Sequence, residues 1–513
     1  MNILIFSSMC QPANESYQLV SSIRYGVQYS RNAGAYKIAS AMRSLGHQVE
    51  VFDFATYFTD KEIKQFIDSR ISNIDIVGWS AQFFHRFDFY HKWCNYIQSI
   101  KPSVVFIAGG PKVLNLLNFT QSKYLIAGYA EFAIADVLAH IEKTYNSLKF
   151  KIVNNQYYVD CDEFYKSDIL PNMSTVYHQS DCISAEETLT LGLSRGCIFK
   201  CSFCTYPGIG KKKGTFIRDG AQSYYDEMMT NFNHWGTTWY YLSDETVNDS
   251  IDKLLDLEEA VLKLPFKPTM IGFSRLDLMV RQREYWEVYK NIGFTYWQFG
   301  IESFNHPTLK AMNKGHSPKK LKEALIELKD FFKDEVHITA SFIVGGPYDT
   351  PASLEETMQW LGNEGNDAVS GLAIFSLNLQ RESEYAVGSE FSQNYQKYGY
   401  REMTDSEIQK EMLEDPTLTL EIVEETKRYN ILWINDYWNV FSAERTVKKL
   451  HQTVLAKAGT NVWKKGQLHS ANIPIELINN VKNTEQVTDL WRRNIPVLLS
   501  EYLDKKMKQE WKQ

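Results

Sequence analysis

Short apolar runs alternate with amphipathic segments along the first 140 residues of the chain. The runs show little polar alternation, and the segments between them place apolar residues at helical spacing. Buried strands separated by helices are typical of a parallel sheet that is covered on both faces. The predicted strands are Asn2–Ser7, Gln48–Phe54, Ile74–Ser80, Ser103–Gly110 and Tyr124–Gly128, and the predicted helices include Ala35–Leu45, Asp60–Arg70 and Phe87–Ile100. In such sheets, ligands bind at the carboxyl ends of the strands.

A second series of strands and helices begins at Thr188, after a predicted hairpin at Lys151–Asp160 and a polar connector. Six strands with intervening helices predict a partial or full (β/α) barrel, whose active site lies at the carboxyl ends of the strands. The predicted strands are Thr188–Gly196, Thr238–Ser243, Met270–Arg275, Thr295–Glu302, Ile338–Gly345 and Gly371–Leu377; the predicted helices are Ile251–Leu264, Arg281–Ile292, Ser317–Phe332 and Leu354–Gly362.

The chain beyond Gln380 contains further helical patterns, at Asp405–Glu414 and Thr419–Val440. Aromatic residues crowd the segment Tyr429–Phe441. Packing against the barrel explains them most simply, since large aromatic side chains dominate cores. A substrate lid or pocket is the alternative.

Composition narrows the functional classes. A length of 513 residues suggests about three domains, and the net charge of −7 argues against a dedicated nucleic-acid-binding surface. No run of about twenty apolar residues predicts a membrane span, and the start of the chain lacks the positive region of a signal peptide. Seven cysteines, three of them clustered, suit a reducing cytoplasm better than a disulfide framework.

The clustered cysteines are Cys197, Cys201 and Cys204, at C-x₃-C-x₂-C spacing directly after a predicted strand. Three thiolates can hold a cubane iron–sulfur cluster and leave its fourth iron open to a ligand. A structural zinc site wants four ligands, and the next cysteine or histidine after Cys204 is the distant His234. Three ordinary buried thiols are the remaining alternative.

Charged residues stand at the carboxyl ends of three barrel strands: Asp244 and Glu245, Arg275, and Glu302. An unpaired charge beside such apolar strands is costly, so each needs a partner. The partners are either one another, with Arg275 paired to Asp277 or Glu302, or a ligand that carries both an ammonium and a carboxylate. The clustering beside three cysteines favours the ligand.

These motifs resemble the radical S-adenosylmethionine (SAM) superfamily. The resemblance spans Leu191–Leu379 and rests on the cysteine loop with Phe203 before its last cysteine, and on four strand-end segments that follow in order: YLSDETVND from Tyr241, FSRLDL from Phe273, FGIESFNHPTLKAMNKGHS from Phe299 and SFIVGGPYDT from Ser341. It implies a partial (β/α)₆ barrel, a [4Fe–4S] cluster on the three cysteines, and reductive cleavage of SAM to methionine and a 5′-deoxyadenosyl radical.

The resemblance also implies roles for individual residues. Phe203 would lie against the adenine of SAM, and Ser243, Asp244 and Glu245 would receive its ammonium group. The family often has Gly-Gly-Glu at the latter positions, so the first two depart from the pattern. Ser274 and Arg275 would bind the carboxylate, and Glu302 the ribose hydroxyls or the ammonium. Gly345 completes the expected cofactor-binding set.

The N-terminal layer resembles the Rossmann-like cobalamin-binding domain that precedes the barrel in one branch of this superfamily. The matching segments are VGWSAQ, IAGGP and AGYAE, and the residues expected at the corrin are Ser80, Gly109, Gly110, Gly128 and Glu131. No Asp-x-His-x-x-Gly stretch supplies a lower axial histidine, so a degenerate domain retained as a scaffold stays open. Methylthiotransferases fit less well, because they use a second cluster on three N-terminal cysteines and only Cys10 and Cys94 lie in this region.

The predicted organisation is α/β: a cobalamin-binding-like domain at 1–148, a hairpin and connector at 149–186, a radical SAM barrel at 187–380 and a mainly helical region at 381–513. The predicted function is a radical SAM enzyme, cobalamin-dependent, that methylates an unactivated carbon of a small molecule or peptide. The alternatives are a cobalamin-independent rearrangement, cyclisation or dehydrogenation, and a non-catalytic iron–sulfur sensor or scaffold. An electron donor such as flavodoxin or ferredoxin is the expected protein partner.

Overall fold

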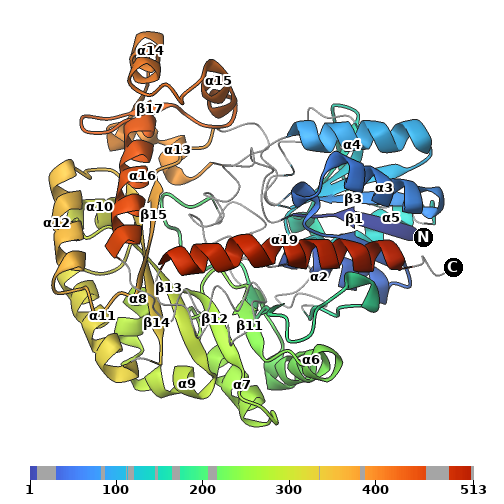
Figure 1. Cartoon of the computed structure of the whole chain (residues 1–513), viewed down its shortest axis with the longest axis horizontal. Helices are drawn as coiled ribbons and strands as arrows, with labels where there is room; N and C mark the ends of the chain where they lie inside the picture. Colours follow the sequence, from blue (N-terminus) through green and yellow to red (C-terminus); the bar gives the residue numbers. More distant parts are fainter. Residues whose placement is uncertain are drawn as a thin grey trace.

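The structure is a computed structural model that describes residues 1–8, 31–81, 87–110, 113, 121–144, 148–164, 174–205, 216–333, 335–381, 388–457 and 484–509. Its N-terminal part contains a seven-stranded sheet in the order β2-β1-β3-β4-β5-β7-β6 (Figure 1). The strands are β1 Asn2–Phe6, β2 Gln48–Phe52, β3 Ile76–Ser80, β4 Val105–Gly109, β5 Ser122–Ala127, β6 Lys151–Val153 and β7 Gln156–Asp160. The predicted parallel sheet is confirmed for β1 to β5.

The hairpin β6–β7 belongs to this sheet, which the sequence did not predict. Strand β7 pairs in parallel with β5, and β6 pairs antiparallel with β7 at the sheet edge. Helices α2 (Ala33–Ser44) and α5 (Ile134–Ile141) supply the apolar core on one face of the sheet, and α3 (Asp60–Arg70) and α4 (Phe87–Ile100) supply the core on the other. The sheet is therefore covered on both faces, as its continuous apolar strands require.

The second part of the chain forms the predicted barrel, which is partial. Its six strands lie in the order β15-β14-β13-β12-β11-β8, and all neighbouring pairs are parallel. The strands are β8 Leu189–Leu191, β11 Trp239–Leu242, β12 Thr269–Ser274, β13 Phe294–Glu302, β14 His337–Val344 and β15 Gly371–Ser376; a short antiparallel pair, β9 Ser194–Arg195 and β10 Phe216–Ile217, follows β8. The helices are α6 Gly220–Trp235, α7 Ile251–Leu262, α8 Leu276–Arg281, α9 Trp286–Asn291, α10 His306–Ala311, α11 Pro318–Phe332 and α12 Pro351–Gly362.

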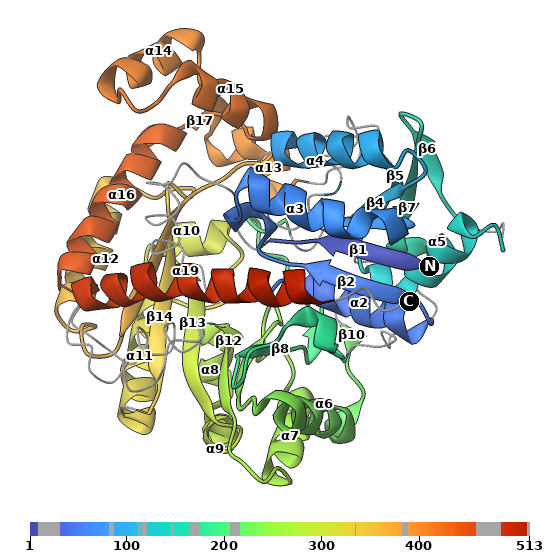
Figure 2. The same cartoon turned by 45° about the vertical axis from the view of Figure 1, so that its right-hand side comes forward.

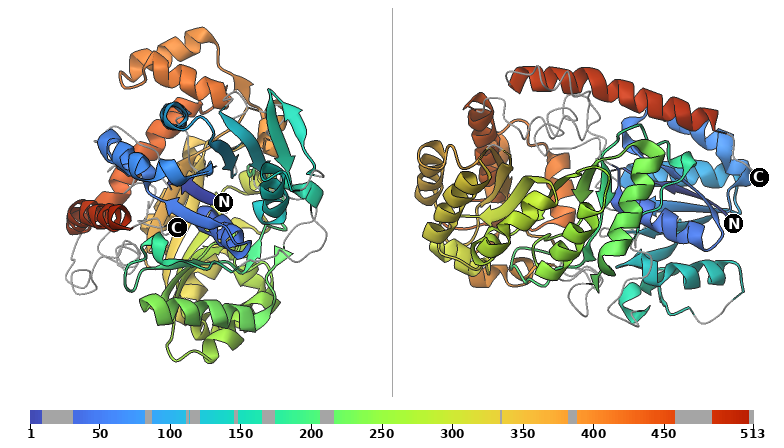
Figure 3. Two further views of the ribbon diagram at one scale, coloured as in Figure 1. Left: turned by 90° about the vertical axis from the view of Figure 1, so that its right-hand side faces the viewer. Right: turned by 90° about the horizontal axis from the view of Figure 1, so that it is seen from below.

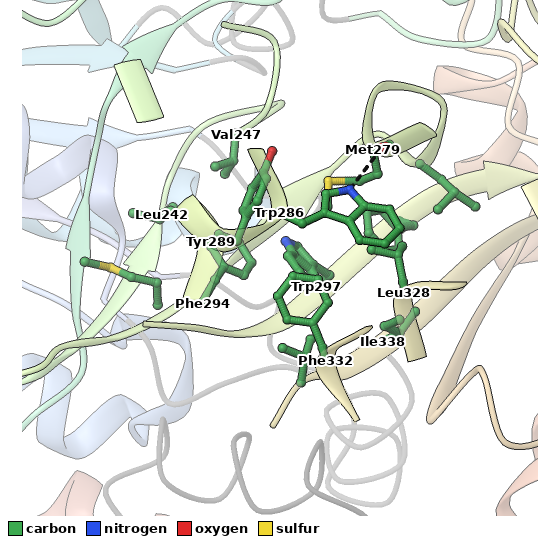
Figure 4. Close-up of a cluster of buried hydrophobic side chains, with 14 of the residues drawn as sticks. Leu242, Val247, Met279, Trp286, Tyr289, Phe294, Trp297, Leu328, Phe332 and Ile338 are labelled. Carbon is green, nitrogen blue, oxygen red and sulfur yellow. Dashed lines mark hydrogen bonds between the residues drawn. The ribbon is translucent and has the colours of Figure 1, made fainter. Parts of the chain in front are cut away.

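One predicted barrel helix, Arg281–Ile292, is wrong in extent. Helix α8 ends at Arg281, a short 3₁₀ turn follows, and α9 begins only at Trp286. The indole of Trp286 packs inward and donates a hydrogen bond of 3.1 Å to the carbonyl of Met279 (Figure 4). Around it, aromatic side chains fill the space between strands and helices, with Trp297 stacked on Phe294 at 5.0 Å and edge-on to Phe332 at 4.8 Å.

The C-terminal region covers one side of the barrel before it returns to the N-terminal part. Its elements are α13 Glu390–Gln393, β16 Arg401–Glu402, α14 Asp405–Glu414, α15 Leu420–Tyr429, β17 Trp433–Ile434, α16 Val440–Lys457 and α19 Thr484–Lys508. The predicted helix Thr419–Val440 is wrong, because α15 ends at Tyr429. The side chain of Asn435 then accepts two backbone N–H bonds of a turn, and that of Asn439 accepts the first N–H bonds of α16.

Two aromatic residues of this segment, Trp433 and Trp438, pack against the barrel, in agreement with the simpler interpretation. Trp433 is fully buried and Trp438 nearly so, in a core shared with Val344, Ile374 and Leu377. The last helix, α19, crosses to the N-terminal sheet (Figures 1 and 2). There the hydroxyl of Tyr502 accepts a 2.8 Å bond from the Asp53 N–H. Among the described residues, no helix combines the length and apolar character needed to cross a membrane.

Candidate active site

The cysteine loop leaves β9 at Gly196, whose φ of +93° lies in the region that glycine adopts without strain. All three cysteines are half-buried. Two later elements fix the loop: the Ser202 N–H donates to the Met312 carbonyl at 3.2 Å, and the Asn313 amide donates to the Lys200 carbonyl at 2.8 Å. The segment after α10 therefore holds the loop at the barrel mouth.

Arg275 connects the end of β12 to the cysteine loop. Its guanidinium donates to the Cys201 sulfur at 3.2 Å and lies over the Phe199 ring, 3.9 Å from the centroid. It also binds Asp277 through two hydrogen bonds of 2.9 and 2.8 Å. Burial pushes the pKa of Asp277 up, but the bonds and charge of Arg275 outweigh this and leave the pKa below its usual value. The internal pairing of Arg275 that the sequence left open is thus present.

Glu302 also has an internal partner. Its carboxylate lies 3.2 Å from the ammonium of Lys314, which donates a further 2.8 Å bond to the Gly300 carbonyl. Glu302 stands at an irregularity in the pairing of β13 with β14 and has a φ of +73°. Such strain in a non-glycine residue is typical of functional positions. Lys314 lies within a motif quoted above, but the sequence analysis gave it no role; its ammonium is 5.5 Å from the centroid of the Phe203 ring.

Asp244 lies in a buried ionic network. It accepts bonds from the Ser194 hydroxyl at 2.5 Å and the Leu193 N–H at 2.9 Å, and it is 3.2 Å from the ammonium of Lys253. Lys253 is fully buried and also pairs with Asp249 at 2.5 Å. The neighbouring Glu245 adds to burial in raising the pKa of Tyr129, a residue of the N-terminal part. Asp244 therefore has three structural partners: the Ser194 hydroxyl, the Leu193 N–H and the Lys253 ammonium.

Ser274 and Gly345 differ in their surroundings. The Ser274 hydroxyl is buried and has no hydrogen-bond partner among the described residues. Gly345, with a φ of +85°, makes room for Trp433, because a Cβ there would lie 2.5 Å from the indole ring. Its N–H and carbonyl bond to Asp349 at 3.1 Å and Tyr400 at 2.7 Å.

The residues expected at the corrin lie at the carboxyl ends of the strands of the N-terminal sheet. Ser80, Gly109 and Gly128 stand at or directly after the ends of β3, β4 and β5, and the Ser80 hydroxyl accepts a 3.0 Å bond from the Asn32 amide. Glu131 reaches the barrel and pairs with Arg195 at 3.3 Å, two residues before Cys197. Gly110 follows β4 with a φ of +114°. Through Glu131, the carboxyl end of the N-terminal sheet thus contacts β9, the strand that leads into the cysteine loop.

The three thiols at the barrel mouth are of the ligand type that an iron–sulfur cluster requires. Three thiols stand in one loop at the barrel mouth, a guanidinium bonds to one of them, and the buried Ser274 hydroxyl lacks a partner within the described chain. The described side chains form no group of three or more His, Cys, Asp or Glu placed to hold a metal ion. The Cys197 sulfur lies 3.7 Å from the Thr246 hydroxyl.

Comparisons with known proteins extend these observations. Residues 191–361 match the Radical SAM superfamily. The chain is 24% identical over 192 residues to the ribosomal protein uS12 methylthiotransferase RimO of Campylobacter fetus. This alignment covers 35% of this chain and 42% of that relative. It is 23% identical over 313 residues to the bacteriochlorophyllide d C-8(2)-methyltransferase of Chlorobaculum tepidum, covering 58% of this chain and 59% of that protein. The chain thus spans less than two thirds of either relative.

Two solved structures share the fold over most of the chain. The radical SAM methyltransferase TsrM of Kitasatospora setae, with cobalamin and a [4Fe–4S] cluster bound, has a TM-score of 0.59 at 12% identity and covers 78% of this chain and 80% of its own. The cobalamin-dependent SAM radical enzyme OxsB, with aqua-cobalamin and SAM bound, also has a TM-score of 0.59, at 14% identity, and covers 98% of this chain and 71% of its own. At these identities, the likeness establishes the architecture.

Proposed function

We propose that the chain is a cobalamin-dependent radical SAM methyltransferase that acts on an unactivated carbon, because residues 191–361 match the Radical SAM superfamily and the solved structures of TsrM and OxsB share its architecture. The observation that carries the proposal is the contact between Glu131 and Arg195. It joins the carboxyl end of the N-terminal sheet, where the corrin is expected, to the strand before the cysteine loop. This contact supports a shared interface for the two proposed cofactor sites. A small molecule or a peptide is the proposed substrate class.

Cys197, Cys201 and Cys204 would hold a [4Fe–4S] cluster, whose family chemistry is to supply the electron that cleaves SAM, while cobalamin would supply the methyl group. Arg275 donates a 3.2 Å hydrogen bond to the Cys201 sulfur and so would orient this ligand in the loop. Asp277 in turn orients Arg275 through two bonds. The Ser274 hydroxyl is available to a polar group of SAM.

Glu302 and Glu245 are the carboxylates proposed to meet SAM. Lys314 holds the Glu302 side chain over Gly300, where a Cβ would lie 2.5 Å from the carboxylate oxygen. Gly300 therefore gives Glu302 the room it needs to fold back at the strand end. The half-buried ring of Phe203 packs against the core that contains Met312 and Val344.

Methyl transfer by the anaerobically reconstituted protein tests this function. In the presence of a reductant, SAM and a substrate, the product is expected to be heavier than the substrate by one methylene only when cobalamin is added. A product of unchanged mass, formed equally well without cobalamin, would instead support the rearrangement, cyclisation or dehydrogenation alternative. Formation of 5′-deoxyadenosine without any product would show that cleavage occurs and that the substrate was wrong.

A cluster protein without catalysis is the remaining alternative. In that case SAM added to the reduced, cluster-loaded protein yields no 5′-deoxyadenosine. The Cys201→Ala variant is the matched control for the expected cleavage, because it removes one thiol and leaves the N-terminal sheet untouched. Cleavage that survives this substitution would contradict the assignment of the cluster to these cysteines.

A further inference from the structure

Lys37 reaches from the N-terminal domain into the barrel. It lies on α2, is 1% exposed, and its ammonium donates a 3.3 Å hydrogen bond to the hydroxyl of Ser243, directly after β11. Ser243 begins the strand-end segment Ser243–Glu245 that is the candidate site for the SAM ammonium group. Lys37 thus connects the candidate corrin domain to the candidate SAM site by a single side chain.

Gly192 on the barrel provides the room for this side chain. A Cβ at Gly192 would lie 2.4 Å from the Lys37 nitrogen, which would have to move, and in a tight contact of 3.2 Å with the Ser243 oxygen. The backbone of Gly192 has no positive φ, so conformational freedom does not explain a glycine there. Space for the lysine does.

Lys37 has no ion-pair partner within 4 Å among the described residues. The charged groups that act on it are Arg195, Glu227, Glu131 and Asp244, from three different elements and the end of a fourth. Each carboxylate already has a closer partner: Glu131 pairs with Arg195, Glu227 with Arg218, and Asp244 with Lys253. Burial is the main effect and lowers the pKa of Lys37 to about 7, with the charge of Arg195 acting in the same direction.

A buried amine without a counter-charge destabilises the fold, and an apolar side chain of similar length would fill the same space at lower cost. The residue is therefore explained by what it does at Ser243. We propose that Lys37 is a positioning residue for SAM, which fixes the Ser243–Glu245 segment from across the domain boundary; this inference rests on the proposed function. Gly192 is its structural counterpart on the barrel.

The stability of the protein without cofactors tests the first half of this inference. Above pH 7 the folded protein loses the Lys37 proton, whereas the unfolded chain keeps it up to about pH 10.5. The unfolded state binds more protons in this window, so the wild-type protein gains stability as pH rises through it. Lys37→Met is expected to raise the melting temperature most at pH 6 to 7, with a gain that shrinks towards pH 10. If Lys37→Met melts at a lower temperature than the wild type at pH 6, the claim that the buried Lys37 amine lacks an ion-pair partner is wrong.

SAM affinity of the cluster-loaded protein, measured by calorimetry, tests the second half. Lys37→Met and Ser243→Ala are each expected to weaken binding about tenfold, and the double variant no further, since both remove the same hydrogen bond. Gly192→Ala should also weaken binding, because its Cβ would displace the Lys37 nitrogen from the Ser243 hydroxyl.

Lys506→Met is the matched control. Lys506 is fully buried on α19 and lies 3.6 Å from the Glu50 carboxylate, so its loss should lower the melting temperature and leave SAM affinity unchanged. A Lys37→Met protein that binds SAM as the wild type does would overturn the positioning role while the proposed function stands. A wild-type protein that loads its cluster and binds no SAM would overturn both.

Discussion

Charged residues at the barrel mouth meet partners inside the protein. Arg275 pairs with Asp277, Glu302 with Lys314 and Asp244 with Lys253, at distances between 2.8 and 3.2 Å. Pairing removes most of the penalty for burying each charge and fixes the side chains before any ligand arrives. Asp244 belongs to the buried network around Lys253.

The two carboxylates are therefore expected to respond differently to loss of charge. Asp244→Asn leaves Lys253 with one carboxylate fewer in a dry site, and should lower the free energy of unfolding by about 2 kcal/mol. Glu245→Gln should weaken SAM binding. Denaturant unfolding of the apoprotein and calorimetry with the loaded protein separate the effects. An Asp244→Asn protein as stable as the wild type, or a Glu245→Gln protein with unchanged SAM affinity, would contradict these roles.

Sequence reasoning identified this set of residues but could not choose their partners. The need of Arg275 for a carboxylate follows from its position beside apolar strands, and Asp277 was one of the partners it allowed. Lys314 and Lys37 were missed, because a lysine 12 residues after Glu302, or in another domain, gives no local signal of contact. The glycines at 192 and 300 were the available signals, since each lies where a side chain of another residue needs room.

Element boundaries follow from local chemistry where caps are present in the sequence. Helix α3 begins at Asp60 after a Thr59–Glu62 capping box, as the pattern predicted. The predicted helix Thr419–Val440 failed because Asn435 and Asn439 bind backbone N–H groups in place of the helix, and its apolar pattern continues through the break. The place of the β6–β7 hairpin on the sheet edge depends on tertiary pairing with β5, which no local pattern encodes.

The loop after β14 and strand β17 are packed together through Gly345. Gly345→Ala would bring a methyl group into the Trp433 ring and impose a left-handed conformation on alanine, so it should lower the free energy of unfolding by about 3 kcal/mol. Gly362→Ala is the control, because its Cβ meets nothing within 4 Å at the end of α12, and it should stabilise by up to about 1 kcal/mol. Tryptophan fluorescence and denaturant unfolding measure both, and a neutral Gly345→Ala would contradict the packing.

The whole molecule is held together by contacts between segments far apart in the chain. Figure 3 shows α19 lying along the N-terminal part, where Tyr502 and Leu503 are buried. The guanidinium of Arg31 lies 5.5 Å from the Tyr502 ring centroid and donates hydrogen bonds of 2.7 and 2.9 Å to the carbonyls of Asp181 and Cys182 in the connector. The C-terminal helix, the first sheet and the connector thus share one buried cluster.

This cluster predicts that α19 supports the N-terminal sheet. Tyr502→Phe removes the bond to the Asp53 N–H and should lower the free energy of unfolding by about 1 kcal/mol, whereas Tyr502→Ala also empties a buried site and should lower it by about 4 kcal/mol. Hydrogen exchange of β2 should rise in both variants, and more in Tyr502→Ala. Unchanged exchange in β2 would show that α19 does not contribute to the sheet.

The spectrum of the reduced cluster, recorded by electron paramagnetic resonance with and without SAM, tests the central claim most directly. Three cysteine ligands leave one iron open, so SAM is expected to change the signal of the wild-type protein, and Cys201→Ala should abolish that signal. A metal centre whose signal is indifferent to SAM, or a preparation that contains zinc in place of iron and sulfide, would contradict the account.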